Sequence, residues 1–231
     1  LSFQPNTCWM YGPSFEVAAR LVEIFSGQAF DVFLRERLFQ PLGMVDSGYT
    51  VNSAQLERFS AFYAPGENGG PLKLLDAPET SFHYIPDGKL PSDAFTPGGF
   101  GSISTPADLL RFSQMLLNRG TLDGARILAP ATVDLMAANH LPPALLPYAF
   151  MGGQPFYGYG HGLGVHTLMD HGLAGVPCAN GEYWKDGGSG TLFWVDPHHR
   201  LTGVVLYQLD PFWVYPLWTQ TKALVYQAMD V

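Results

Sequence analysis

Apolar side chains recur every three or four positions near the start of the chain, which is the spacing of one face of an α-helix. A helix is predicted to begin at Pro13 or Ser14 and to end at Gly27, because proline suits a first helical turn and glycine a C-terminal cap. Its apolar positions are Val17, Ala18, Leu21, Val22 and Phe25. A second amphipathic helix is predicted from about Ala29 to Leu38, with Phe30, Phe33 and Leu34 on one face.

The helical pattern weakens over residues 46–101, where glycine and proline clusters mark turns at residues 66–71 and 86–88. A mostly irregular segment is expected, with room only for short strands. Irregular segments of this length are uncommon in a compact domain unless they line a site or cover one. Substrate-facing residues are therefore expected in this segment.

Two further helices are predicted before residue 150. Thr105 can cap the first, Pro106 fits its first helical position, Asp108 lies three residues after the cap, and Gly120 ends it. Its buried side is predicted to be Leu109, Leu110, Phe112, Met115 and Leu116. The second opens at residues 129–132 and runs to about Ala138, with Leu135 and Met136 expected in the core.

After Pro142 the pattern changes to glycine, aromatic and β-branched residues, which is typical of strands. Strands are predicted at Tyr157–Thr167, Gly190–Val195 and Leu201–Leu209, and the short connection between the last two favours an antiparallel hairpin. A final helix, Pro216–Met229, should pack on the sheet. The fold class is therefore α+β. Residues 1–150 form a mainly helical region with long loops, and residues 151–231 form an antiparallel sheet with a C-terminal helix.

The composition restricts the class of protein. Hydrophobic residues make up 47% and charged residues 14%, which indicates a folded globular chain. The net charge is −8, with 12 Lys and Arg against 20 Asp and Glu, and nucleic acid or an anionic membrane is therefore not an expected partner. No apolar run approaches the roughly 20 residues needed to cross a bilayer. Two cysteines, Cys8 and Cys178, do not fix a compartment, although a cytoplasmic location fits them.

Three histidines, His161, His166 and His171, recur every five residues and raise the hypothesis of a metal site. An odd spacing places alternate members on opposite faces of a strand, and no Cys or Glu completes a known ligand set. Hydrogen-bonded or solvated loop histidines are expected instead, and no metal or organic cofactor is predicted. A Gly-x-Ser-x-Gly elbow and a phosphate-binding glycine motif are both missing from the sequence.

The stretch Gly181–Asp196 joins a basic, glycine-rich segment to an apolar run. Lys185 stands just before glycines at 187, 188 and 190. Successive amides in such a segment can point at an anionic oxygen. A cation beside exposed amides can form an oxyanion site, but a glycine-rich turn with a solvated lysine fits the local pattern as well.

Four segments read together resemble the serine β-lactamase and penicillin-binding-protein superfamily, in its class C-like branch of family VIII carboxylesterases. The segments are residues 11–23 with 41–44, residues 97–108, residues 124–128 and residues 181–197. The match follows chain order over nearly the whole sequence. It implies the C-terminal part of the β-lactamase/DD-peptidase-like fold, and a serine hydrolase that acts on small ester or amide substrates through an acyl-enzyme.

The resemblance assigns roles to four residues. Tyr11 falls where the tyrosine of the second family motif is expected, and it would be the catalytic base. Lys185 falls where the third motif is expected, and Gly187 and Gly188 would form part of an oxyanion and substrate-binding site. Two positions differ from lactamases, because Pro13 replaces an Asn and Asp186 replaces a hydroxyl residue. Both differences favour an ester substrate.

The nucleophile motif of the family, Ser-x-x-Lys, is missing from this sequence. The lysines are Lys73, Lys89, Lys185 and Lys222, and none follows a serine by three positions. The chain, which starts at Leu1, is therefore interpreted as the C-terminal portion of a longer hydrolase, inactive by itself. A companion chain that carries the motif, a β-lactamase or D-amino-acid peptidase activity, and a non-catalytic binding protein on the same scaffold are the alternatives.

Overall fold

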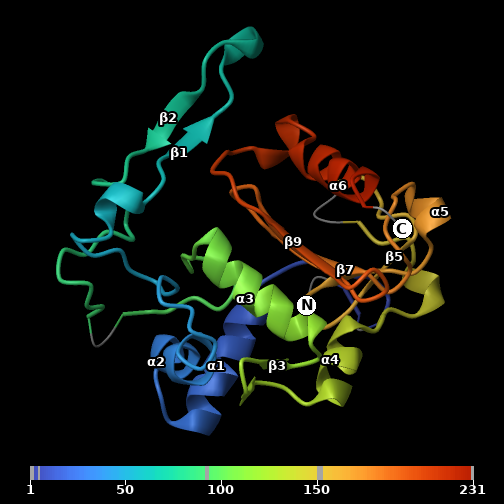
Figure 1. Ribbon diagram of the computed structural model, residues 1–231, viewed down its shortest axis with the longest axis horizontal. Coiled ribbons are helices and arrows are strands. Elements are labelled where there is room, and N and C mark those ends of the chain that lie inside the picture. Colours follow the sequence, from blue (N-terminus) through green and yellow to red (C-terminus); the bar gives the residue numbers. More distant parts are fainter. Residues whose placement is uncertain (1–2, 5, 92–93, 150–152, 230–231) are drawn as a thin grey trace.

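A five-stranded antiparallel sheet with helices on both faces forms the centre of the molecule (Figure 1). The computed structural model describes residues 3–4, 6–91, 94–149 and 153–229. The strands follow chain order, and each pairs with its sequence neighbours. They are β5 (Tyr159–His161), β6 (His166–Leu168), β7 (Tyr183–Gly187), β8 (Thr191–Asp196) and β9 (Leu201–Val205).

The two faces of the sheet have separate apolar cores because side chains alternate along each strand. On one face Tyr183 and Val195 join a cluster with Met115 and Leu116 of helix α3 (Pro106–Leu117). On the other face Trp184, Leu192 and Trp194 are covered by helix α6 (Leu217–Gln227) through Trp218 and Val225. The predicted hairpin of the last two strands and the predicted terminal helix are confirmed.

Helix α3 begins where its capping pattern predicts. Thr105 has extended backbone, its Oγ1 accepts a hydrogen bond from the Asp108 amide at 3.2 Å, and Pro106 is the first helical residue. Met115 and Leu116 are buried as expected. The prediction that Leu110 is also buried is wrong, because its side chain is 44% exposed.

Removing the cap of α3 should lower stability measurably. In Thr105→Ala one amide of the first turn loses its acceptor, and we expect the free energy of unfolding to fall by about 1 kcal/mol. Urea titration followed by circular dichroism measures this change. The matched control, Thr105→Ser, keeps an oxygen at the same position and should stay close to wild type; equal losses in the two variants would contradict the role of the cap.

The first two predicted helices are present. Helix α1 (Ser14–Ser26) ends at Gly27, whose φ of 70° lies in the left-handed region and whose amide bonds to Glu23 O. Helix α2 (Phe30–Leu34) continues as a π-helical turn, η1 (Arg35–Phe39).

The apolar stripe of α1 is exposed over Val17 (60%), Leu21 (45%) and Phe25 (83%). The buried residue of α1 is Ala19, which lies outside this stripe and packs against Gly98. The amphipathic pattern is therefore real, but nothing in the described part of the chain covers its apolar side.

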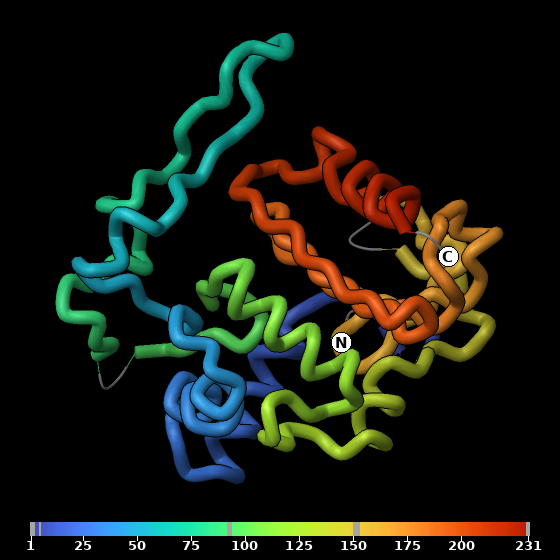
Figure 2. Tube along the Cα trace, in the orientation of Figure 1, coloured from blue at the N-terminus to red at the C-terminus, as the bar shows by residue number. Residues whose placement is uncertain are grey.

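The segment of residues 46–101 is irregular with short elements, as predicted. It contains η2 (Leu56–Arg58), β1 (Phe62–Ala64), η3 (Glu67–Gly69) and β2 (Lys73–Asp76). β1 and β2 pair into an antiparallel arm that extends away from the rest of the molecule (Figures 1 and 2). The base of the arm is fixed by two hydrogen bonds, Tyr63 N to Gln208 O and Asp210 N to Tyr63 O.

Two predictions in the second half need correction. The single strand predicted at Tyr157–Thr167 is the hairpin of β5 and β6, which reverses at Gly164 with a φ of 84°. Helix α4 (Pro130–Ala137) forms as predicted, and Met136 packs against the core, but Leu135 is 54% exposed. The predicted boundary between residues 150 and 151 lies outside the described residues.

The remaining elements are short. They are β3 (Thr121–Leu122), β4 (Ala125–Arg126), η4 (Pro143–Leu145), α5 (His171–Ala174) and η5 (Phe212–Val214). Within the described ranges, no helix is both long and apolar enough to span a membrane.

Candidate active site

The N-terminal segment reaches the sheet before α1 begins. The Trp9 ring packs edge-on against Tyr148 at 4.8 Å and is tilted against His161 of β5 at 5.1 Å, measured between ring centroids. Two residues later, the Tyr11 ring centroid lies 5.4 Å from Lys185 Nζ on β7. The structure therefore brings together the two residues proposed as catalytic from the sequence, although they are 174 positions apart along the chain.

Two of the segments that carry the family resemblance, residues 11–23 and 97–108, are hydrogen-bonded to each other. The Glu16 carboxylate, in the first turn of α1, accepts hydrogen bonds from the amides of Gly98 at 2.7 Å and Gly99 at 2.9 Å. Gly98 approaches closely, because an added Cβ would lie 2.3 Å from Phe15 O. The turn of β5 and β6 packs on the same residue, since a Cβ on Gly164 would meet the Phe15 ring at 3.2 Å.

Lys185 is not the solvated lysine of the simpler sequence interpretation. Its ammonium bonds to Asp186 Oδ1 at 2.6 Å and to Asp186 O at 3.0 Å, and both side chains are largely buried. Burial by itself would raise the pKa of Asp186, but the contacts with His166 and Lys185 outweigh it and hold that pKa well below its usual range. The carboxylate is therefore ionised and neutralises part of the lysine charge.

The glycine-rich stretch forms the turn between β7 and β8. Gly190 N donates to Gly187 O at 3.0 Å, and the φ of 96° at Gly190 requires a residue without a side chain. A Cβ on Gly187 would lie 2.2 Å from Thr191 Oγ1, whereas Gly188 is exposed to open space. Among the described residues, no acceptor takes the Gly188 amide hydrogen. The role of Gly188 as an oxyanion donor remains a prediction.

The turn is also held from the far face of the sheet. Trp218 of α6 donates its indole N–H to Gly190 O at 3.1 Å. The Tyr207 ring packs directly on Gly190, where an added Cβ would lie 2.1 Å from a ring carbon. Gly190, two residues after Gly188, is therefore held by two aromatic side chains.

His161 and His166 do not lie along one strand, contrary to the prediction from the sequence. His161 and His166 face each other across the β5–β6 hairpin, with ring centroids 5.5 Å apart, so the argument from a single continuous strand was wrong. His166 is 3% exposed, and its Nδ1 lies 2.6 Å from the Tyr148 hydroxyl. His171 starts α5 instead. In the parts of the chain that are described, no group of three or more His, Cys, Asp or Glu side chains could hold a metal ion.

The sequence did not predict the contacts of His166 with His161 and Tyr148. A signal was present for the first of these, because the glycines at 162 and 164 mark a turn and make the two histidines partners across a hairpin. No sequence signal connects Tyr148 with His166.

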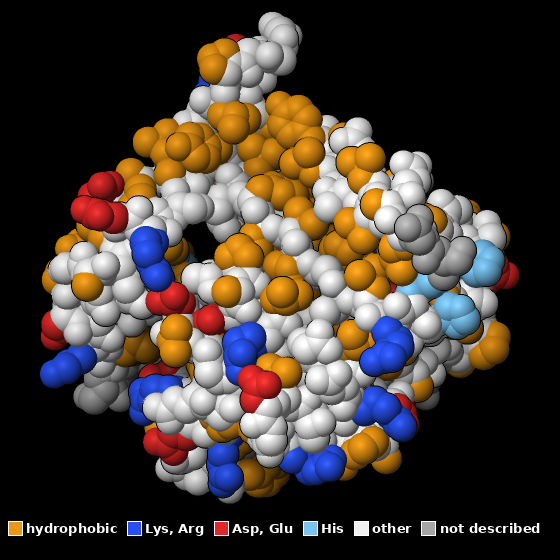
Figure 3. All heavy atoms as spheres, viewed as in Figure 1, with side chains coloured by type: hydrophobic (Ala, Val, Ile, Leu, Met, Phe, Trp, Pro, Cys, Tyr) orange, Lys and Arg blue, Asp and Glu red, His pale blue; other side chains and the backbone are white. Residues whose placement is uncertain are grey.

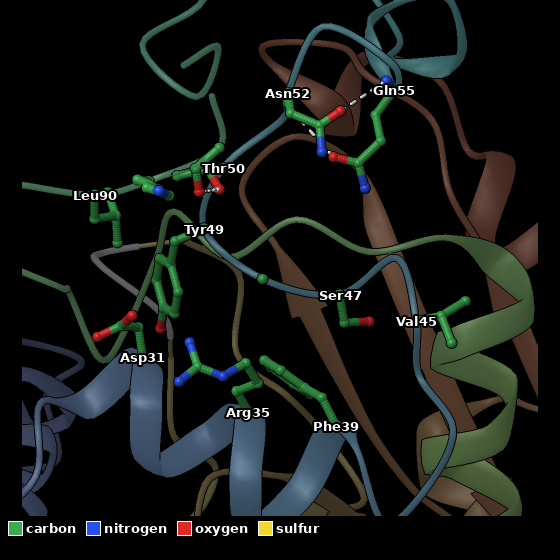
Figure 4. A pocket seen from close by; sticks show the side chains of 13 residues that line it. Asp31, Arg35, Phe39, Val45, Ser47, Tyr49, Thr50, Asn52, Gln55 and Leu90 are labelled. Carbon is green, nitrogen blue, oxygen red and sulfur yellow. Dashed lines mark hydrogen bonds between the residues drawn. The ribbon is translucent and has the colours of Figure 1, made fainter. Parts of the chain in front are cut away.

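Residues of the long irregular segment line a cavity of about 620 Å³ (Figure 4). Asp31 of α2 and Arg35 of η1 project into it toward Tyr49, whose hydroxyl donates to Pro97 O at 2.8 Å. Tyr11 and Lys185 are not among its lining residues. The expectation that this segment faces substrate therefore remains a prediction.

A second, more apolar cavity of about 570 Å³ lies between the arm and α6. Figure 3 shows hydrophobic side chains gathered over this part of the surface. The cavity is lined by residues that include Tyr63, Leu72, Tyr207, Leu209, Tyr215 and Leu217.

A helix-covered antiparallel sheet, with a lysine on a strand facing a tyrosine from the helical side, is the arrangement of the serine β-lactamase and penicillin-binding-protein superfamily. The chain belongs to this superfamily of hydrolases and acyltransferases: the family model described as Beta-lactamase matches residues 1–226.

Named relatives agree with the family. Lovastatin esterase from Penicillium rubens is 32% identical over 88% of this chain and 51% of that protein. The solved structure of a simvastatin synthase variant from Aspergillus terreus superposes with a TM-score of 0.79 at 26% identity, over 98% of this chain and 56% of that one. The hydrolase EstCE1 shares the fold, with a TM-score of 0.76 at 23% identity, over 97% of this chain and 57% of that one. The chain spans about half the length of the curated relatives that it matches.

Proposed function

We propose that this chain is the C-terminal part of a serine hydrolase that cleaves carboxylic esters through an acyl-enzyme. The observation that carries the proposal is the position of the Lys185 ammonium 5.4 Å from the Tyr11 ring in a chain of the Beta-lactamase family. The similarity to a protein named lovastatin esterase supports an ester substrate.

The proposed chemistry uses three groups of this chain. The phenolate oxygen of Tyr11 takes the proton of the serine hydroxyl and becomes a neutral phenol as the serine oxygen attacks the ester carbonyl, because a neutral hydroxyl is a weak nucleophile. The amide of Gly188 donates to the tetrahedral oxyanion, and the charge of Lys185 stabilises the negative groups nearby. Tyr11 returns the proton to the departing alcohol, and a water molecule then releases the acid from the serine.

The serine belongs, in this proposal, to a segment outside the chain. Two surfaces support such a segment. The apolar stripe of α1 is exposed at Val17, Leu21 and Phe25. In the described structure β9 is also the edge of the sheet, with β8 on one side and no further strand on the other. Exposed apolar stripes and free strand edges are normally covered, here by an upstream segment or a companion chain.

The environment of Lys185 supports esters over β-lactams and D-Ala-D-Ala peptides. Those substrates carry a carboxylate, which a free lysine would attract. Asp186 lies 2.6 Å from Lys185 Nζ and opposes an incoming anion. Pro13 offers no side-chain hydrogen bond to a substrate amide.

Acyl transfer to an alcohol is a second candidate function. A relative named monacolin J acid methylbutanoyltransferase, from Aspergillus terreus, is 28% identical over 90% of this chain. The same acyl-enzyme would form, and an alcohol rather than water would then accept the acyl group.

The test uses the longer protein that carries this chain. We expect a fluorophosphonate probe to label one serine outside residues 1–231, and p-nitrophenyl butyrate to be cleaved in preference to nitrocefin and a D-Ala-D-Ala peptide. Added alcohol should yield a new ester if the second candidate holds. Absence of labelling would contradict a serine hydrolase, and a preference for nitrocefin or the peptide would replace the esterase with a lactamase or peptidase.

A further inference from the structure

A buried histidine stands behind the catalytic lysine. His166 on β6 lies opposite Trp184 in the strand register, and its Nε2 is 3.8 Å from Asp186 Oδ1. The same carboxylate oxygen accepts from Lys185 Nζ at 2.6 Å. One oxygen of Asp186 therefore lies between the imidazole and the ammonium.

The imidazole is held in one orientation. Its ring stacks on Trp184, with centroids 4.0 Å apart and planes 14° from parallel, and Phe156 packs on it at 4.8 Å. The single hydrogen of the Tyr148 hydroxyl has two acceptors within reach, His166 Nδ1 at 2.6 Å and Gly160 O at 3.1 Å. Rotation of the ring would break the stack and the hydrogen bond together, so Nε2 stays directed at Asp186.

The surroundings also set the charge of His166. The titratable groups that face it are His161 from β5, Tyr148 from the preceding loop, and Lys185 and Asp186 from β7. Burial is the largest cause of a lowered pKa for His166, and Asp186 opposes that effect only in part. A neutral imidazole carries one N–H, and a carboxylate facing Nε2 favours the hydrogen there.

We propose that His166 is a positioning residue for Lys185 and acts through Asp186. In this arrangement Nε2–H faces the Asp186 carboxylate and attracts it electrostatically across 3.8 Å, and the Tyr148 hydrogen lies on the nearer of its two acceptors, Nδ1. The carboxylate in turn holds the lysine ammonium beside Tyr11. The expected effect of His166 on the turnover number rests on the function proposed above. The expected position of the hydrogen on the His166 ring does not depend on that function.

The arrangement implies a loss of activity in acid. A proton added to Nδ1 makes the imidazole a cation, which competes with Lys185 for the same carboxylate oxygen. The lysine is then held less firmly beside Tyr11. The turnover number should therefore fall at a pH below the ordinary titration range of histidine, because the pKa of His166 is lowered.

The first test reads the hydrogen position directly. Nitrogen NMR of the histidine-labelled protein should show His166 as the Nε2–H tautomer at neutral pH. Asp186→Asn should mix the two tautomers because the carboxylate is gone, and it keeps the shape of the side chain. An Nδ1–H tautomer in the wild-type protein would overturn the proposal.

The second test compares two amides that cannot titrate. His166→Gln places an amide nitrogen near the position of Nε2, whereas His166→Asn places one near Nδ1. We expect the Gln variant to stay within about threefold of the wild-type turnover number and the Asn variant to fall about tenfold. Both should lack the acid loss attributed to His166. Equal turnover in the two variants, or the same acid loss in both, would refute the positioning role.

The two proposals fail separately. If the full-length protein cleaves no ester, the proposed function falls, and the tautomer measurement still decides the role of His166. If ester cleavage is found and His166 is the Nδ1–H tautomer, the proposed esterase function is supported and the positioning role of His166 is refuted.

Discussion

Tyr11→Phe is expected to lower the turnover number for p-nitrophenyl butyrate by about 100-fold or more, which is the usual contribution of a general base. The change removes only the phenolic oxygen. The ring that packs near Phe15 at 6.1 Å and faces Lys185 Nζ at 5.4 Å is retained. Because binding surfaces are unchanged, KM should move far less than the turnover number.

The matched control for Tyr11→Phe is Tyr157→Phe, which removes an equivalent hydroxyl from an exposed side chain. It should leave both kinetic constants near wild type. The rate of fluorophosphonate labelling should fall with turnover in Tyr11→Phe, since both need the activated serine. A Tyr11→Phe enzyme within threefold of wild type would remove Tyr11 from the mechanism and with it the main support for the proposed site.

The second large effect concerns stability. Lys222→Met should lower the free energy of unfolding by roughly 3–5 kcal/mol at neutral pH, because it leaves a buried charge without its partner. Lys222 of α6 donates to Glu182 Oε1, and Glu182 is fully buried. The other carboxylate oxygen, Oε2, has no partner among the described residues. Such a loss is a large share of the roughly 5–15 kcal/mol that typical domains have.

The loss should depend on pH. Burial is the largest cause of a raised pKa for Glu182, and Lys222 opposes it. An acid whose pKa is raised by folding contributes stability that is complete below its unfolded pKa and is lost as pH rises through the folded pKa. Without Lys222 the carboxyl can still take up a proton in acid. The deficit of Lys222→Met, measured by denaturant titration, should therefore be smaller at pH 5 than at pH 8.

The control for this pair is the double variant Glu182→Met, Lys222→Met. Two apolar side chains of similar length remove both charges, and such replacements are often neutral or stabilising. We expect the double variant to recover most of the loss of the single variant. A double variant as unstable as Lys222→Met would show that the loss comes from packing and not from the unpaired carboxylate.

Features set by neighbouring residues could be predicted from the sequence. The cap at Thr105, the left-handed glycine at Gly27 and the final hairpin depend on contacts a few positions apart, and all three are present. The β5–β6 hairpin was missed because residues 157–167 were interpreted as one strand, although glycines at 162 and 164 interrupt them. The left-handed φ of Gly164 marks where the chain reverses.

Features that depend on distant partners could not be predicted from local pattern. The pairing of Lys185 with Asp186 is set by side-chain rotation, and the burial of His166 depends on Tyr148 and Trp184. The proximity of Tyr11 and Lys185 followed from a family resemblance and not from the spacing of residues. In the same way, amphipathicity predicted α1 but could not say which part of the protein covers Val17 and Phe25.

The anchoring of Gly190 has a consequence for communication through the sheet. Its carbonyl is held by Trp218 of the last helix, and its amide closes the turn that presents Gly188. A fusion partner attached at the C-terminus, or a ligand lodged against Tyr207, would act on this glycine from the face opposite Tyr11. Gly190 thus connects the helix-covered far face of the sheet with the turn that contains Gly188, the residue proposed as an oxyanion donor.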